Sequence, residues 1–136
     1  MKLMLDLNVL LDVVQKRQPH YPASAEILDI ALKERCGVIP AHALTTLHYL
    51  ITKHADKAMA DEFLDWLLQK FSIATTSMET FLLARQLKMP DFEDAVVSAN
   101  AQEQGCEYII TRNRKDFKNS SIQALTPAEF LSLQRQ

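Results

Sequence analysis

The sequence predicts an α/β fold in which a parallel sheet of four to five strands is covered by helices on both faces. Short apolar runs alternate along the chain with longer segments whose apolar residues recur at helical spacing. This alternation is typical of parallel strands joined by helical crossovers. With 136 residues, of which 48% are hydrophobic, the chain is long enough to bury one core, so we expect a single domain over residues 1–136.

Five short segments are the predicted strands. The first is continuously apolar rather than alternating, as expected for a strand buried on both faces. Gly37 lies at the start of the second and Pro40 closes it, while Gly105 lies just upstream of the fourth. The segments are residues 2–5 (KLML), 36–41 (CGVIPA), 71–77 (FSIATTS), 107–113 (EYIITRN) and 122–125 (IQAL).

Helices are predicted between these strands, beginning with one that carries Asp12. The last is the most clearly marked, because Thr126 can cap it, Pro127 suits its first position and Glu129 can complete a capping box. Apolar residues recur at helical spacing in residues 23–33, 43–53, 59–71, 79–87 and 91–103.

Composition excludes several classes of function. The net charge of −2 gives no overall attraction to polyanions, so a nucleic acid would need a local patch or a bound metal. Only Gly37 and Gly105 are glycines, which argues against a glycine-rich phosphate loop. Cys36 and Cys106 are isolated, as expected for buried thiols of a reduced, cytoplasmic protein. No apolar run approaches the roughly 18 residues of a membrane span, and no signal peptide is expected.

Polar residues gather where the predicted strands end, at the edge where open parallel sheets bind their ligands. Three clusters are expected to meet there: Asp6 with Asn8, Thr111–Asn113 with Asp116, and Asp91 with Glu93 and Asp94.

Each cluster has a purely structural interpretation. Asp6 can accept backbone N–H bonds, and Asn8 can cap the first helix. Asp91 and Asp94 have the spacing of an acidic capping box, which the helix dipole also favours. Asp116 can cap the short turn that contains it. Asp12 has the pattern of a solvated helix residue.

The functional interpretation rests on their convergence. Carboxylates that lie close together repel one another and raise one another's pKa unless a cation neutralises them. Oxygen ligands without His or Cys partners favour Mg²⁺ or Mn²⁺ over Zn²⁺, and the four histidines show no ligand spacing.

The same residues carry a family resemblance. The opening "LMLDLNVLLDVV" resembles that of the PIN-domain nucleases, in which a strand leads into Asp-x-Asn-x-x-x-Asp. The stretch "DFEDAVVSANAQEQGCEYIITRNRKDF" is similar to their second half, and "LTPAEFL" is similar to the end of many bacterial members. The resemblance covers essentially the whole chain and implies a three-layer α/β/α, PIN-like fold.

The resemblance also implies a site. By position, Asp6, Asp94 and Asp116 match the family's metal-binding and catalytic acids, which hold Mg²⁺ or Mn²⁺. Asn8 and Asn113 match residues that support them. The weaker matches are Asp91, Glu93 and Asp12.

One position departs from the family pattern. Many PIN domains place a Glu on the helix after the second strand, whereas Thr46 occupies that place here, after Thr45. We therefore expect weaker metal binding, one ion rather than two, or recruitment of Glu93 as a substitute.

The implied activity is that of a metal-dependent endoribonuclease acting on single-stranded RNA. The expected phosphate contacts are Arg112, Arg114 and Lys115, although a solvated loop explains these residues equally well. Many small bacterial members are VapC-type toxins, so the resemblance implies an antitoxin partner and a homodimer. The apolar stripe of residues 59–71, beside Trp66, is then either core or part of such an interface.

Two alternatives stay open. Because of Thr46, the chain could be an inactive PIN-fold module that binds RNA or protein. A phosphoacceptor receiver domain also clusters acids at strand ends, but it needs an Asp after the third strand and a Lys after the fifth, and neither is present.

Overall fold

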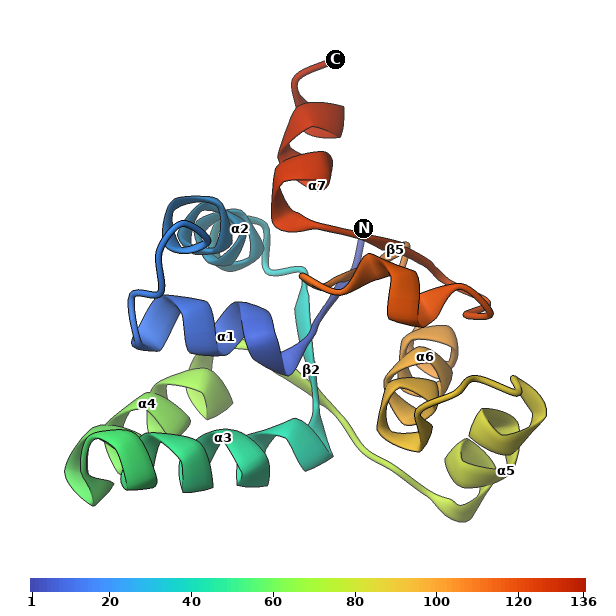
Figure 1. The fold of residues 1–136 in the computed structure, drawn as a ribbon, viewed down its shortest axis with the longest axis horizontal. Helices are drawn as coiled ribbons and strands as arrows, with labels where there is room; N and C mark the ends of the chain where they lie inside the picture. Colours follow the sequence, from blue (N-terminus) through green and yellow to red (C-terminus); the bar gives the residue numbers. More distant parts are fainter.

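The computed structural model describes residues 1–136 and places a five-stranded parallel sheet between helices (Figure 1). The strand order is β3-β2-β1-β4-β5, and every neighbouring pair is parallel. The strands are β1 (Leu3–Leu5), β2 (Gly37–Pro40), β3 (Ser72–Ala74), β4 (Tyr108–Ile110) and β5 (Gln123–Leu125). The strand order changes direction between β1 and β4, so a ligand crevice is expected at their carboxyl ends.

Seven α-helices and one short 3₁₀ helix, η1, connect the strands. They are α1 (Leu7–Val14), α2 (Tyr21–Glu34), α3 (Ala41–His54), α4 (Lys57–Lys70), α5 (Met78–Gln86), α6 (Phe92–Gln104), η1 (Arg114–Phe117) and α7 (Pro127–Gln134). The predicted α/β fold with helices on both faces is confirmed, and the predicted strand and helix positions agree with the structure to within a few residues.

Neighbouring residues of each strand enter two different cores, as the alternation of side chains along a strand requires. Leu3 and Leu5 of β1 belong to the larger core, which contains residues of α1, α2, α3, α4 and α7. Met4 belongs to the smaller core on the opposite face, with residues of α6 and η1. Helix α5 lies outside this second layer and packs on α6. Because both faces of β1 are covered, its continuous apolar sequence is explained.

The helix ends follow the predicted capping chemistry. At α7 the Thr126 hydroxyl accepts a hydrogen bond from the Glu129 N–H (3.2 Å), and the Glu129 carboxylate accepts one from the Thr126 N–H (2.9 Å). At α6 the Asp91 carboxylate accepts a hydrogen bond from the Asp94 N–H (3.0 Å). The position of α6 matters most here, because its first turn carries the predicted acidic residues.

The two cysteines are buried free thiols, as predicted. Burial raises the pKa of the Cys106 thiol to about 11, so this thiol stays protonated and unreactive at neutral pH. No helix has the length and apolar character that crossing a bilayer requires.

Gly37 allows β2 to pass close to the end of α4. A Cβ atom at this position would lie 2.5 Å from Cδ1 of Phe71 and 3.1 Å from Cβ of Ala31. The Phe71 ring is only 7% exposed and would have to shift to make room for the added methyl group. We expect Gly37→Ala to lower the free energy of unfolding by about 1–3 kcal/mol, as overpacking of a core does. Urea unfolding measures this, and an unchanged midpoint would contradict the packing described.

Candidate active site

Asp6 lies at the carboxyl end of β1, where it also caps α1. Its carboxylate accepts one hydrogen bond from the Leu7 N–H (2.9 Å) and another from the Thr111 hydroxyl (2.8 Å). Burial raises the pKa of Asp6, and these two hydrogen bonds act in the opposite direction. The carboxylate is therefore fixed in place between the ends of two neighbouring strands, as a ligand or catalytic group should be.

Thr111 is the centre of the hydrogen bonds that hold Asp6. Its side chain is fully buried, and its Oγ1 also accepts hydrogen bonds from the Asn8 side-chain amide (3.4 Å) and the Asn113 N–H (3.1 Å). The Asn8 carbonyl oxygen in turn accepts one from the Arg112 N–H (3.2 Å). Asn8 thus joins α1 to the loop after β4, and its interpretation as a helix cap is wrong, because Asp6 is the cap.

The sequence interpretation placed Thr111 in this loop but gave it no role of its own. The available signal was its position directly after the fourth strand, beside the first strand's Asp6 in a parallel sheet. A small hydroxyl at that point can bridge two strand ends, which is what it does.

The other predicted acids of the strand-end clusters all affect the pKa of Asp94. Burial and the negative charges of its neighbours raise the pKa of Asp94 from 3.8 to about 7. The neighbours responsible, in order of effect, are Asp6, Asp91, Asp116 and Glu93. All five predicted acids of the strand-end clusters therefore share one electrostatic environment, although they come from three separate parts of the chain.

These carboxylates do not form a closed ligand cage. No group of three or more His, Cys, Asp or Glu side chains has a spacing that could hold a metal ion without movement. Asp91 uses one carboxylate oxygen to cap α6, and Asp116 lies exposed in η1, where its expected role as a cap is wrong. The donor set nevertheless fits a hard divalent cation in its chemistry, because it is made of mutually repelling carboxylates.

Helix α3 begins at the carboxyl end of β2, where the family pattern has its additional acid. Thr46 is half-buried and supplies no charge there. His42, in the first turn of the same helix, acts on the site instead: burial raises the pKa of Asp6, and the imidazole opposes this shift. Both ring nitrogens of His42 are buried and have no hydrogen-bond partner. The sequence interpretation missed this residue because it searched the histidines only for ligand spacing.

Asp12 is fully buried, so its interpretation as a solvated helix residue is wrong. Its Oδ2 atom lies 3.1 Å from Nε of Arg112 and accepts a hydrogen bond from the Ser24 hydroxyl (3.3 Å). The contact with Arg112 has ion-pair distance but not hydrogen-bond geometry. Arg112 is thereby directed toward the interior, which leaves it poorly placed for phosphate.

The other two predicted phosphate contacts are at the surface. Arg114 forms an exposed ion pair with Glu129 (2.9 Å), and Lys115 is exposed without an ion-pair partner. Of the three cations in this loop, Lys115 is the freest to meet a nucleic acid.

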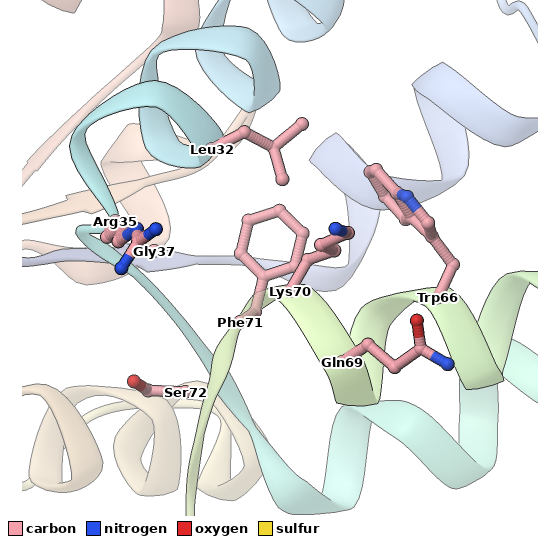
Figure 2. Close-up of a pocket in the computed structure, with 8 residues that line it drawn as sticks. All are labelled: Leu32, Arg35, Gly37, Trp66, Gln69, Lys70, Phe71 and Ser72. Carbon is pink, nitrogen blue, oxygen red and sulfur yellow. The ribbon is translucent and has the colours of Figure 1, made fainter.

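The largest cavity, about 640 Å³, lies at the opposite edge of the sheet. Figure 2 shows its lining, which comes from the ends of α2 and α4 and from Gly37 and Ser72, the first residues of β2 and β3. Arg35 and Lys70 supply positive charge, but two helix carboxyl ends meet here, and these carry negative partial charge. The cations are explained by the helix ends, so we do not assign this cavity to phosphate binding.

The raised pKa of Asp94 has a consequence for stability. Between its ordinary pKa of 3.8 and about 7, the folded protein binds a proton at Asp94 that the unfolded chain releases. The free energy of unfolding therefore falls as pH rises through this range when no metal is bound. Urea unfolding in EDTA at several pH values should show a smaller decrease for Asp94→Asn than for the wild type. Equal pH profiles would contradict the assignment.

Comparison with known proteins agrees with this geometry. A family model described as the PIN domain matches residues 2–115. Ribonuclease VapC1 from Aquifex aeolicus (strain VF5) is 28% identical over an alignment of 134 residues, which covers 95% of this chain and 92% of that protein.

Solved structures share the fold. VapBC2 from Rickettsia felis, bound to a DNA fragment from its promoter, matches with a TM-score of 0.74 at 19% identity, covering 93% of this chain and 98% of that one. A toxin–antitoxin complex from Klebsiella pneumoniae matches with a TM-score of 0.72 at 22% identity and the same coverage. The match over residues 2–115 covers four of the five strands and the predicted acids from Asp6 to Asp94, and the chain belongs to the PIN domain family.

Proposed function

We propose that this protein is a divalent-metal-dependent endoribonuclease that cleaves single-stranded RNA. The observation that carries the proposal is the gathering of Asp6, Asp94 and Asp116 in one environment, where burial and then the neighbouring negative charges raise the pKa of Asp94 to about 7. So much uncompensated charge at the carboxyl edge of the sheet is costly unless a cation binds there. Membership of the PIN domain family and the similarity to a ribonuclease support the same activity.

In this proposal Asp6, Asp94 and Asp116 hold one or two Mg²⁺ or Mn²⁺ ions. A bound ion would activate water and neutralise charge on the phosphate oxygens. The chain's own contribution is orientation, since Thr111 and the Leu7 N–H keep the Asp6 carboxylate in one position. Glu93 contributes negative charge at the edge that Thr46 leaves without an acid.

Substrate placement follows from the surrounding charge. An RNA phosphate must approach a site of net negative charge. Positive side chains near the metal would reduce the electrostatic repulsion between the phosphate and the carboxylates. Lys115 and Arg114, in the loop that carries Asp116, are the candidates for contacts with flanking phosphates. A single strand is the favoured substrate because its backbone can deform to reach the acidic edge.

We extend the proposal to an antitoxin partner, because the solved structures with this fold include toxin–antitoxin complexes. Homodimer formation remains a prediction. The apolar stripe of α4 was predicted to be either core or interface. Part of it is core, because Ala60 and Leu67 are buried. Met59 and Leu68 are 44% and 51% exposed, so they remain available for an interface.

The decisive experiment measures cleavage and metal binding separately. Purified protein should cleave a single-stranded RNA when Mn²⁺ or Mg²⁺ is present and stop when EDTA is added. The same ions should raise the melting temperature by several degrees at saturating concentration, because they bind only the folded state. Cleavage that continues in EDTA would reject the metal mechanism.

A second function is favoured by two observations, the neutral Thr46 and the lack of a preformed ligand cage. The chain would then be a PIN-fold module that binds RNA without cutting it. RNA binding with no cleavage in Mn²⁺ or Mg²⁺, and no thermal shift on adding either ion, would identify this outcome.

A further inference from the structure

We infer that a pocket beside the acidic edge binds one unpaired nucleobase of the RNA next to the cleaved phosphodiester. The inference rests on the proposed ribonuclease function and adds a substrate-binding site to it. The pocket has a volume of about 220 Å³. Its lining residues are His42, Thr76, Phe81, Phe92, Glu93 and Val96.

The pocket is formed where three helices approach one another at the carboxyl edge of the sheet. The amino end of α3 supplies one wall, α5 and α6 supply another, and the connection from β3 to α5 closes it. Figure 1 shows the amino end of α3 directed toward the α5–α6 pair. The volume lies below the roughly 300–1,000 Å³ of pockets for drug-sized ligands, so it suits a single ring system.

Two phenylalanines make the pocket suitable for stacking. The rings of Phe81 and Phe92 are stacked, with centroids 5.8 Å apart and planes 26° from parallel. Phe81 and Phe92 are 46% and 47% exposed, so neither ring is buried in the hydrophobic core. Exposed aromatic rings beside a nucleic-acid site are the platforms on which single-stranded bases stack.

The surface of the pocket is almost entirely apolar, and the polar groups of its lining residues lie at its margin or behind it. The hydroxyl of Thr76 is held by the side-chain amide of the fully buried Asn100, at 3.5 Å. Glu93 offers carboxylate oxygens as acceptors. Both ring nitrogens of His42 are buried without a partner, which is costly for polar groups, so a base edge that reached them would relieve this cost.

The pocket adjoins the acids of the proposed site. Glu93 and His42, on opposite walls, both act electrostatically on Asp6. A phosphate is therefore a poor occupant, because Glu93 and the neighbouring carboxylates repel it. A flat, neutral aromatic ring matches the stacked phenylalanines and the largely apolar surface of the pocket. With a base in this pocket, its own phosphate would lie toward the carboxylates.

The test measures binding of a short single-stranded RNA that is 2′-O-methylated to prevent cleavage, by fluorescence anisotropy, with the full-length protein. A series of oligonucleotides carries one abasic site that is moved along the strand. Phe92→Ala and Phe81→Ala remove the stacking platform, and Phe92→Leu keeps apolar bulk without the ring. Tyr49→Ala is the control, since Tyr49 is an aromatic residue 61% exposed on α3 and outside the pocket.

We expect Phe92→Ala and Phe81→Ala to weaken binding by roughly 5- to 100-fold, the range for loss of one stacked base. Phe92→Leu should lose nearly as much, and Tyr49→Ala should bind as the wild type does. The RNA affinity of the wild type should fall when the abasic site is at one particular position. The affinity of Phe92→Ala should not depend on that position, because the ring that the missing base would contact is already absent.

Three results would overturn the inference. If the wild type binds and cleaves RNA but Phe92→Ala binds it equally well, the pocket does not hold a base and the ribonuclease function stands. If abasic sensitivity persists in Phe92→Ala, the base binds elsewhere. If the phenylalanine variants keep RNA affinity but lose self-association or antitoxin binding, the rings belong to a protein interface. Failure of the wild type to bind any RNA would remove the proposed function as well.

Discussion

Asp6→Asn is expected to abolish RNA cleavage while the protein remains folded. The substitution removes the charge that the proposed metal site needs at its most firmly held carboxylate. The loss should exceed the roughly 10- to 100-fold that follows removal of a partner of a metal ligand. Initial rates of RNA cleavage in saturating Mn²⁺ measure it, with circular dichroism to verify the fold.

The free energy of unfolding of Asp6→Asn should not fall with its activity. This difference distinguishes loss of function from loss of the fold. Burial raises the pKa of Asp6, so the ionised carboxylate is less favourable in the folded protein than in the unfolded chain. Asn caps a helix equally well and carries no charge to bury, although its side-chain NH₂ group cannot accept the hydrogen bond from the Thr111 hydroxyl. We expect the free energy of unfolding in EDTA to stay within about 1 kcal/mol of the wild type or to rise. Asp29→Asn, an exposed change on α2, is the matched control and should cleave normally. Full activity of Asp6→Asn would remove Asp6 from the site.

Arg112→Ala is expected to be the most destabilising of the substitutions considered. It leaves the carboxylate of Asp12, which is 0% exposed, without a cation. Removing one partner of a buried ion pair costs about 3–5 kcal/mol, because the other charge stays buried and uncompensated. Urea unfolding at neutral pH measures the change.

Two variants distinguish this explanation from a general sensitivity of the loop. Arg114→Ala breaks the ion pair with Glu129. The side chains of Arg114 and Glu129 are 58% and 39% exposed, so this change should lower the free energy of unfolding by less than about 1 kcal/mol. Replacing both partners of this ion pair, as Asp12→Leu with Arg112→Met, should restore much of the stability that Arg112→Ala loses. If the double variant is no more stable than Arg112→Ala, the buried charge is not the cause.

The elements that were predicted well are those whose signal is local. The continuous apolar run that ends at Leu5 can only be a strand covered on both faces, and it lies at the centre of the sheet. Thr126 and Glu129 specify their own helix end through two hydrogen bonds within four residues. The convergence of Asp6 with Asp94 also followed from a simple rule, because a helix that leads into a parallel strand begins at the edge of the sheet where the other strands end.

The residues that were misjudged depend on partners that are distant in sequence. Asp12 could not be recognised as buried, because Arg112, its ionic partner, lies 100 positions away. Asn8 has the composition of a cap, but its amide is directed to Thr111 and the Arg112 N–H. His42 takes part in the site through its position at the end of β2, which no spacing of histidines reveals.

The hydrogen bond between Thr111 and Asp6 joins residues 105 positions apart. During synthesis on the ribosome, the amino-terminal half of the chain therefore emerges with Asp6 but without the loop that holds it. Contacts this distant form late, since the intervening polypeptide must first be made and ordered. Under the proposed ribonuclease function, we expect an incomplete nascent chain to leave the messenger RNA that encodes it intact, and cleavage to become possible only after translation has passed Asp116.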